Sequence, residues 1–327
     1  MINVKAISVN VGKALLVSAF FMFVSLLISI AEGLDSAFTP LLISLIITTI
    51  VGAFPFIFVR NSPVLTLKDG FLTIFLAWLL SFVFGMLPYV LWGGEFTIIN
   101  AWFESVSGYT TTGSTILTDI EALPQSLLFW RSSTHFIGGL GVIVFLLMIL
   151  PEHSPAKLRL THLELSTLSK EGYRYKTSTI TRVMVTVYIG LTIVETLLLW
   201  AAGMSLFDAV NHAFSTVATG GFSTKNTSVM YFDSTSIDII ITVFMALSAM
   251  HFGVIFAIVA GRSFKPLKHS VTKYYLGIIA VCSIIITFSL KTQGGYESWG
   301  GALLDSTFQT VSYLTTTGFG QADNAMW

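Results

Sequence analysis

The chain has 327 residues, of which 54% are hydrophobic and only 10% are charged, and its formal net charge is zero. Soluble domains carry about 25% charged residues, so this composition excludes an ordinary water-facing surface. The balanced charge gives no reason to expect a nucleic-acid partner, and the single cysteine, Cys282, excludes a disulfide framework. The apolar residues fall in long runs, which predict an integral membrane protein.

Seven apolar runs are predicted to be membrane-spanning helices, because about 20 such residues cross a bilayer core. In chain order they are 14–31, 40–58, 70–92, 126–150, 180–203, 235–260 and 273–291. The first run follows two lysines, as in a signal peptide, but it is long and no small-residue cleavage site follows it. We therefore expect a retained first helix.

Three shorter amphipathic segments, 98–109, 206–217 and 302–314, each follow a predicted spanning helix and end in a Thr/Gly cluster. They are too short to cross a bilayer, which at membrane depth indicates re-entrant pore helices or interfacial helices.

The distribution of positive charge favours the re-entrant interpretation. If the N-terminus is cytoplasmic and each short segment enters and leaves on the outer side, 14 of the 17 Lys and Arg residues fall on the cytoplasmic side. They are Lys5, Lys13, Arg60, Lys68, Lys157, Arg159, Lys170, Arg174, Lys176, Arg182, Arg262, Lys265, Lys268 and Lys273. This satisfies the positive-inside rule, whereas treating the short segments as full spans would spoil the bias.

The Thr/Gly clusters form an internal repeat with a period of roughly 100 residues. The repeated segments are Phe103–Ser114, Phe214–Ser223 and Phe308–Phe319, aligned by matching Gly113, Gly220 and Gly318. Each unit is predicted to contain a spanning helix, a pore helix, a Thr/Gly loop and a second spanning helix. One such cluster alone is also compatible with a glycine-capped helix end, but three on the same membrane side favour a pore.

Thr/Gly loops at membrane depth suit the binding of a monovalent cation. Bare backbone carbonyls must be buried or line a water-filled cavity, and glycine lets successive carbonyls turn toward one axis. Rings of such carbonyls replace the hydration shell of K⁺, whereas Mg²⁺ and Ca²⁺ sites normally use carboxylates. The predicted ligands, with K⁺ as the transported ion and no transition-metal site, are Thr111, Thr112, Gly113, Ala218, Thr219, Gly220, Thr316, Thr317 and Gly318.

Several ionisable residues lie within or beside these units. Glu104 is expected to bond to neighbouring loop amides rather than to set the potential of the outer mouth. Arg131 and His135 lie one helical turn apart and form either a titratable site or backbone contacts, or Arg131 snorkels. His212 is expected to be a packed, hydrogen-bonded histidine, and Glu195 has no evident partner in the sequence.

The pore-loop segments, together with Ala325–Trp327 and the Gly138–Gly141 cluster followed by Pro151, closely resemble those of the TrkH/TrkG potassium uptake proteins. The glycine cluster itself suits close helix packing. The resemblance covers nearly the whole chain and implies four helix–pore–helix domains around one pore. It also implies a homodimeric membrane subunit and a cytoplasmic nucleotide-binding regulator of the TrkA type.

The expected fold is therefore an all-α membrane protein of helix–pore loop–helix units around a pseudo-fourfold pore. The expected domains are an N-terminal helix pair (1–68), a first unit (69–151), a cytoplasmic linker (152–179), a second unit (180–262) and an incomplete third unit (263–327). Because three loops do not close a four-sided filter, the chain is interpreted as the N-terminal portion of a longer protein.

The expected function is K⁺ uptake across the bacterial cytoplasmic membrane, with membrane lipid around the protein and no organic cofactor. Na⁺ or ammonium conduction through the same architecture is the closest alternative, because Thr-Gly loops do not uniquely encode ion size. A non-conducting regulatory or assembly subunit is a further alternative. An enzyme is not expected, since the sequence contains no convergent nucleophile, base or metal ligands.

Overall fold

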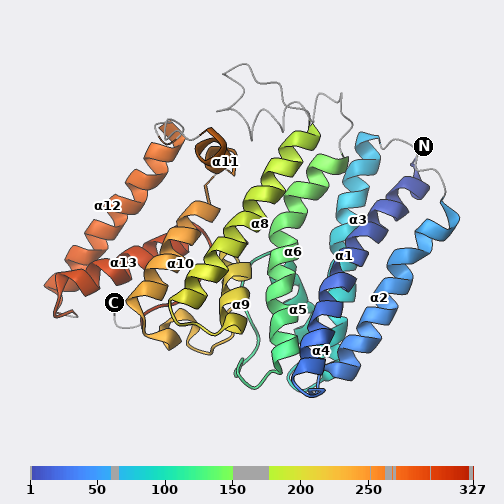
Figure 1. The fold of residues 1–327 in the computed structure, drawn as a ribbon, viewed down its shortest axis with the longest axis horizontal. Helices are drawn as coiled ribbons and strands as arrows, with labels where there is room; N and C mark the ends of the chain where they lie inside the picture. Colours follow the sequence, from blue (N-terminus) through green and yellow to red (C-terminus); the bar gives the residue numbers. More distant parts are fainter. Residues whose placement is uncertain are drawn as a thin grey trace. The chain divides into compact units, whose positions relative to one another are not determined.

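The computed structural model describes residues 2–59, 66–149, 177–250, 252–261, 267, 270–294, 296–323 and 327. Within these ranges the regular structure is entirely helical, as the composition predicts. Five of the described helices are long and apolar enough to cross a membrane, or six if one bent pair is counted as a single span. The chain divides into two compact units: the first contains α1 to α6 and the first residues of α8, up to Thr181, and the second contains the rest of α8, from Arg182, and the helices after it. The helices are labelled in Figure 1.

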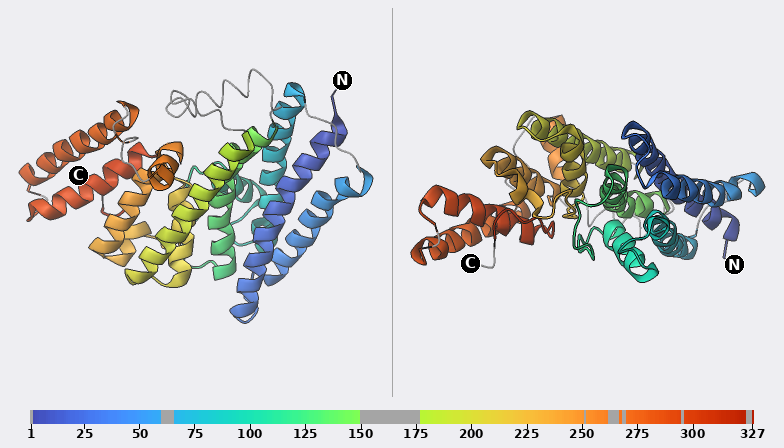
Figure 2. Two further views of the ribbon diagram at one scale, coloured as in Figure 1. Left: turned by 45° about the horizontal axis from the view of Figure 1, so that its top comes forward. Right: turned by 90° about the horizontal axis from the view of Figure 1, so that it is seen from below.

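The first unit is a helical bundle in which the long first helix packs against three others. Its helices are α1 (Val4–Ala31), α2 (Phe38–Phe58), α3 (Leu67–Gly85), α4 (Leu87–Trp92), α5 (Ile98–Tyr109) and α6 (Gln125–Ile149). Helix α1 packs against α2, α3 and α6, and the pair α1 and α2 runs side by side in both views of Figure 2. A β-carbon at Gly12 would lie 2.5 Å from the carbonyl oxygen of Gly52, so small residues permit this close crossing.

Polar caps fix where the helices of the first unit begin. The hydroxyl of Thr66 accepts from the N–H of Asp69, while the Asp69 carboxylate accepts from the N–H of Thr66, which completes a capping box for α3. The same carboxylate accepts from the backbone N–H of Asn3 at 2.9 Å. One side chain therefore ties the start of α1 to the start of α3.

The second unit combines long helices with several shorter ones. Its helices are α8 (Thr177–Ala201), α9 (Leu206–Val217), the 3₁₀ helix η2 (Ser228–Phe232), α10 (Thr235–Ser248), α11 (Phe252–Gly261), α12 (Ser270–Thr292) and α13 (Trp299–Leu314). Helix α10 packs against α9 and α13, and α12 packs against α13. Buried Val229, Ile241, Phe308 and Phe319 belong to the core of this unit.

The predicted helix boundaries are correct for two of the three short helices, whereas α13 begins at Trp299, three residues before its predicted start, and three longer helices also differ from the prediction. Helices α5 and α9 coincide with the predicted segments 98–109 and 206–217. The first helix begins at Val4 rather than at residue 14, because Asn3 caps it and its first turns bury Ala6, Ile7, Val9 and Val11. The predicted span 70–92 is found as the candidate membrane span Lys68–Trp92, although the helix is divided at Met86 into α3 and α4. The predicted helix 235–260 is two helices bent by 108°. Hydropathy cannot report such breaks, since both halves stay apolar.

Candidate functional site: three Thr/Gly loops

The three short helices α5, α9 and α13 end in the same backbone turn. After α5, the N–H of Thr111 donates to the carbonyl of Gly108 at 3.0 Å, and the N–H of Thr112 donates to that of Ser107 at 2.9 Å. This paired pattern is a Schellman motif, which satisfies the last carbonyls of a helix. After α9, the N–H groups of Thr219 and Gly220 donate to the carbonyls of Thr216 and Ser215. After α13, those of Thr316 and Thr317 donate to the carbonyls of Tyr313 and Ser312.

A threonine occupies the left-handed position of each motif. The φ angles of Thr111, Thr219 and Thr316 are 53°, 53° and 59°. Glycine normally fills this position, because a β-branched residue there is strained by about 1–3 kcal/mol. Strain of this kind is found mainly at functional sites, and here it recurs at the same place in all three loops.

A glycine with positive φ follows two residues later in each loop and corrects the predicted alignment. These glycines are Gly113, Gly221 and Gly318, with φ angles of 77°, 83° and 83°. The counterpart of Gly113 in the second loop is therefore Gly221 and not Gly220, as the sequence alignment assumed. In this register Thr219, Gly220 and Gly221 correspond to Thr111, Thr112 and Gly113, and Ala218 caps the end of α9.

Serine side chains tie the end of a short helix to the chain that leaves its loop. The hydroxyl of Ser107 donates to the carbonyl of Ser114 at 2.6 Å, and that of Ser312 donates to the carbonyl of Phe319 at 2.8 Å. Ser215 holds the same position in the second helix. Sequence reasoning missed these serines, although their recurrence at one place in the repeat was a usable signal.

Glu104 and Arg131 form a buried ion pair behind the first loop. Arg131 Nε donates to Glu104 Oε1 at 2.6 Å, and the two side chains are only 2% and 0% exposed. The carboxylate also accepts from the hydroxyl of Thr115 at 3.0 Å and from the N–H of Ile116 at 3.3 Å. The prediction that Glu104 bonds to nearby loop amides is confirmed, and Arg131 is paired rather than snorkelling.

His212 joins the second loop to its own helix. Its Nδ1 lies 2.8 Å from the carbonyl oxygen of Asp208, and its Nε2 lies 2.9 Å from the hydroxyl of Ser223. A carbonyl can only accept, so Nδ1 carries the proton, and in a neutral ring Nε2 accepts from Ser223. The ring also packs against those of Phe232 and Phe319. The predicted packed, hydrogen-bonded histidine is confirmed.

The second and third loops lie against each other within the second unit. A β-carbon at Gly221 would overlap the carbonyl oxygen of Thr317. Farther along, the carbonyl of Gly320 accepts from the N–H groups of Val229 and Met230 at 3.0 and 3.2 Å. The chain leaving the third loop therefore runs along η2, which follows the second loop.

Gln321 anchors the far end of the third loop between two carboxylates. Its amide nitrogen lies 3.1 Å from Asp238 Oδ2 and 2.9 Å from Asp305 Oδ1. Tyr296 donates to the other oxygen of Asp305 at 2.7 Å. Burial and this acceptor raise the pKa of Tyr296 to about 12, so the hydroxyl keeps its proton at neutral pH.

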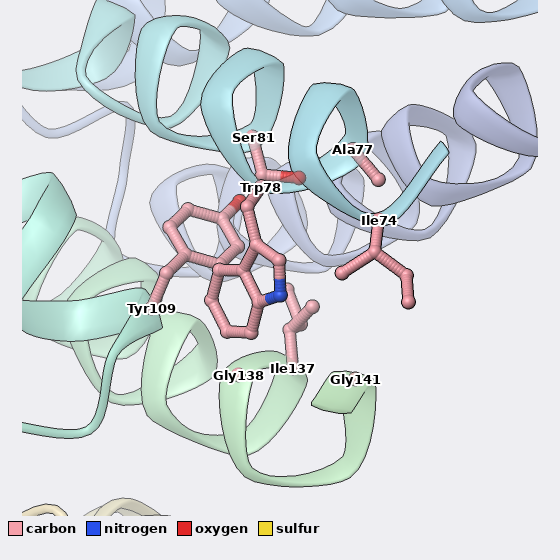
Figure 3. Close-up of a pocket in the computed structure, with 8 residues that line it drawn as sticks. All are labelled: Ile74, Ala77, Trp78, Ser81, Tyr109, Ile137, Gly138 and Gly141. Carbon is pink, nitrogen blue, oxygen red and sulfur yellow. The ribbon is translucent and has the colours of Figure 1, made fainter. Parts of the chain in front are cut away.

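A mainly apolar cavity lies behind the first loop (Figure 3). It is a small, partly open hollow with a cavity volume of about 20 Å³, and its lining comes from α3, α5 and α6. The lining residues are Ile74, Ala77, Trp78, Ser81, Tyr109, Ile137, Gly138 and Gly141. A β-carbon at Gly138 would overlap the carbonyl oxygen of Tyr109, the last residue of α5. The predicted close packing through the glycine cluster is therefore found at Gly138.

Two further ionisable residues were singled out in the sequence. His135 and Glu195 are both fully buried. The predicted cytoplasmic linker 152–179 lies outside the described residues except for its last three positions. No group of three or more His, Cys, Asp or Glu side chains that could hold a metal ion occurs in the part of the chain that the structure describes.

Spanning helices that alternate with short helices, each ending in a strained Thr/Gly turn, define a helical membrane protein of the pore-loop class. The family model TrkH, described as a cation transport protein, matches residues 39–327. The chain belongs to this family.

Relatives in several bacteria share this similarity. The Trk system potassium uptake protein TrkH of Salmonella typhimurium is 36% identical over 271 residues, which are 82% of this chain and 56% of the relative. TrkH of Halomonas elongata is 36% identical over 325 residues, covering 97% and 66%. The crystal structure of the potassium transporter TrkH from Vibrio parahaemolyticus matches with a TM-score of 0.85 and 30% identity, covering all of this chain and 67% of that one. The chain thus spans between half and two thirds of the length of these relatives.

Proposed function

We propose that this chain forms part of the wall of a K⁺ uptake pathway in a bacterial cytoplasmic membrane. The ion is bound by backbone carbonyls of the three loops, at Thr111–Gly113, Thr219–Gly221 and Thr316–Gly318. The observation that carries this proposal is the threefold recurrence of one strained turn, with a left-handed threonine followed two residues later by a positive-φ glycine. Positive φ angles let successive carbonyls turn toward one axis, which is the arrangement that a carbonyl filter requires.

The preference for K⁺ is supported by the chemistry of the loops and by the names of the relatives. The loop residues are neutral, which suits a weakly held monovalent cation better than Mg²⁺ or Ca²⁺. The relatives from Salmonella typhimurium and Halomonas elongata are described as potassium uptake proteins.

The partners proposed for this protein follow from the family resemblance. We infer a homodimeric membrane subunit, a cytoplasmic N-terminus and a cytoplasmic nucleotide-binding regulator of the TrkA type. The outward-facing apolar side chains of α2 and α12, among them Phe54, Ile57, Ile284 and Phe288, suit contact with lipid or with a second subunit. No organic cofactor enters the proposal.

Substitution of Gly113 by serine tests the filter. The serine must adopt a φ of 77°, which is unfavourable for a residue with a β-carbon. This strains the loop and displaces its carbonyls. In the full-length protein in vesicles, we expect the preference for Rb⁺, a K⁺ substitute, over Na⁺ to fall by roughly tenfold or more. Unchanged selectivity would show that this loop does not bind the transported ion.

The same vesicles distinguish the alternatives. A wild-type preference for Na⁺ or ammonium over Rb⁺ would replace K⁺ as the substrate. No flux of any monovalent cation, with or without the regulator, would favour a non-conducting assembly subunit.

A further inference from the structure

The three pore helices carry different polar residues at one structurally equivalent position. Once Gly113, Gly221 and Gly318 are superimposed by backbone conformation, Glu104, His212 and Gln309 occupy the same place in α5, α9 and α13. All three side chains are buried, with exposed fractions of 0%, 0% and 3%. The correspondence is not evident in the sequence, because the three residues differ chemically and because the sequence comparison pairs Gly220 rather than Gly221 with Gly113.

Each of these side chains reaches the segment that leaves its own loop. Glu104 accepts from the hydroxyl of Thr115 at 3.0 Å, and His212 bonds to the hydroxyl of Ser223 at 2.9 Å. Thr115 and Ser223 are themselves equivalent, since each lies two residues after its loop glycine. In the third unit, the amide nitrogen of Gln309 approaches the carbonyl of Phe319 at 3.5 Å.

The three contacts differ in strength. The carboxylate of Glu104 accepts from two groups of the leaving segment and is itself held by Arg131 at 2.6 Å. Charge-assisted hydrogen bonds of this kind are about twice as strong as neutral ones. The His212 contact is neutral but well aligned by its second bond to Asp208. The contact of Gln309 is at the limit of hydrogen-bond distance, and Ser312 and Gln321 supply further anchors there.

We infer that Glu104 and His212 are positioning residues that determine ion selectivity without touching the ion. This inference rests on the proposed function, because it assumes that the loop carbonyls bind the ion. Each strained loop is fixed at its start by the Schellman bonds and after its glycine by bonds to the leaving segment. Glu104 and His212 provide side-chain bonds of the second kind, so their loss lets the carbonyls between the two anchors change their spacing.

The first variant to examine is Glu104→Gln in the full-length protein reconstituted in vesicles. The amide keeps the shape of the side chain but loses the negative charge. That charge pairs with Arg131 and strengthens the hydrogen bonds that the carboxylate accepts from Thr115 and Ile116. We expect Rb⁺ flux to persist while the Rb⁺ over Na⁺ preference falls by roughly tenfold. Glu297→Gln is the control, because it removes the charge of an exposed glutamate outside the three loops, and its preference should equal that of the wild type.

A pair of variants at His212 tests the same idea without a charge change. His212→Gln retains a polar group able to bond to Ser223, whereas His212→Leu removes it. We expect His212→Leu to lower the Rb⁺ over Na⁺ preference and His212→Gln to restore most of it. This pair decides the matter if Glu104→Gln fails to fold.

The outcomes separate this inference from the proposed function. Unchanged preference in both Glu104→Gln and His212→Leu, together with a reduced preference in Gly113→Ser, overturns the positioning role and leaves the filter in place. Unchanged preference in all three overturns the filter itself. A lower melting temperature with an unaltered preference shows that these side chains serve stability alone, which also overturns the inference.

Discussion

Replacement of Arg131 by methionine is expected to destabilise the first unit by about 3–5 kcal/mol, because it leaves the buried Glu104 carboxylate without its charged partner. The ion pair lies between the pore helix α5 and the helix α6 that follows the loop. Its carboxylate also holds Thr115 and Ile116, so its loss loosens the loop as well as the helices. Thermal unfolding of the detergent-solubilised protein measures the effect.

The double variant Glu104→Gln/Arg131→Met separates the charge from the packing. With both charges removed, most of the lost stability should return, because no uncompensated charge stays buried. Lys225→Met is the control, since the amine of Lys225 lies 4.3 Å from the centre of the Tyr231 ring, and such contacts contribute only about 0.5–1 kcal/mol at exposed sites. Equal melting temperatures for Arg131→Met and Lys225→Met would contradict the role given to the ion pair.

Substitution of Gly221 by alanine is expected to have the second large effect, because it combines a strained backbone with a steric overlap. The residue has a φ of 83°, and its β-carbon would overlap the carbonyl oxygen of Thr317 in the neighbouring loop. One loop must move away from the other. We expect loss of Rb⁺ selectivity together with a marked drop in melting temperature.

Two further glycines of the same unit give a graded comparison. Gly318 also has a φ of 83°, but no described atom lies within 4 Å of its added β-carbon, so Gly318→Ala carries only the strain of about 1–2 kcal/mol. Gly320 has neither feature among the described residues, and Gly320→Ala should be close to neutral. The expected order of melting temperatures is Gly221→Ala below Gly318→Ala below Gly320→Ala. A Gly221→Ala variant as stable as Gly320→Ala would show that the two loops do not touch.

The sequence predicted the short helices and the Thr/Gly loops well, because both depend on local properties. The lengths of α5 and α9 follow from polar caps at Thr97 and Ser205 and from the Thr/Gly cluster after each helix. These signals lie within a few residues of the feature that they specify.

The conformation inside the loops was less accessible from sequence. Propensity assigns a left-handed turn position to glycine, yet in all three loops threonine adopts it and the glycine follows two residues later. In the second loop, Gly220 and Gly221 are adjacent, and only the backbone angles distinguish them. The predicted alignment of the second loop was wrong because matching residue identities pairs Thr219-Gly220 with the Thr-Gly pairs of the other two loops.

Tertiary pairings were inaccessible for a different reason. Glu104 and Arg131 are separated by 27 positions in the sequence, and nothing in either helix identifies the other as its partner. The equivalence of Glu104 and His212 likewise emerges only when their loops are compared in three dimensions.

The contact between Gly138 and Tyr109 has a mechanical consequence for the first loop. A β-carbon at Gly138 would overlap the carbonyl of Tyr109, so at this position the backbone of α6 lies directly against the last carbonyl of α5. Side chains at a helix interface can change rotamer and absorb small shifts, whereas two backbones in direct contact have little compliance. Any sliding or rotation of α6 at this level is therefore passed to the residue where the loop begins.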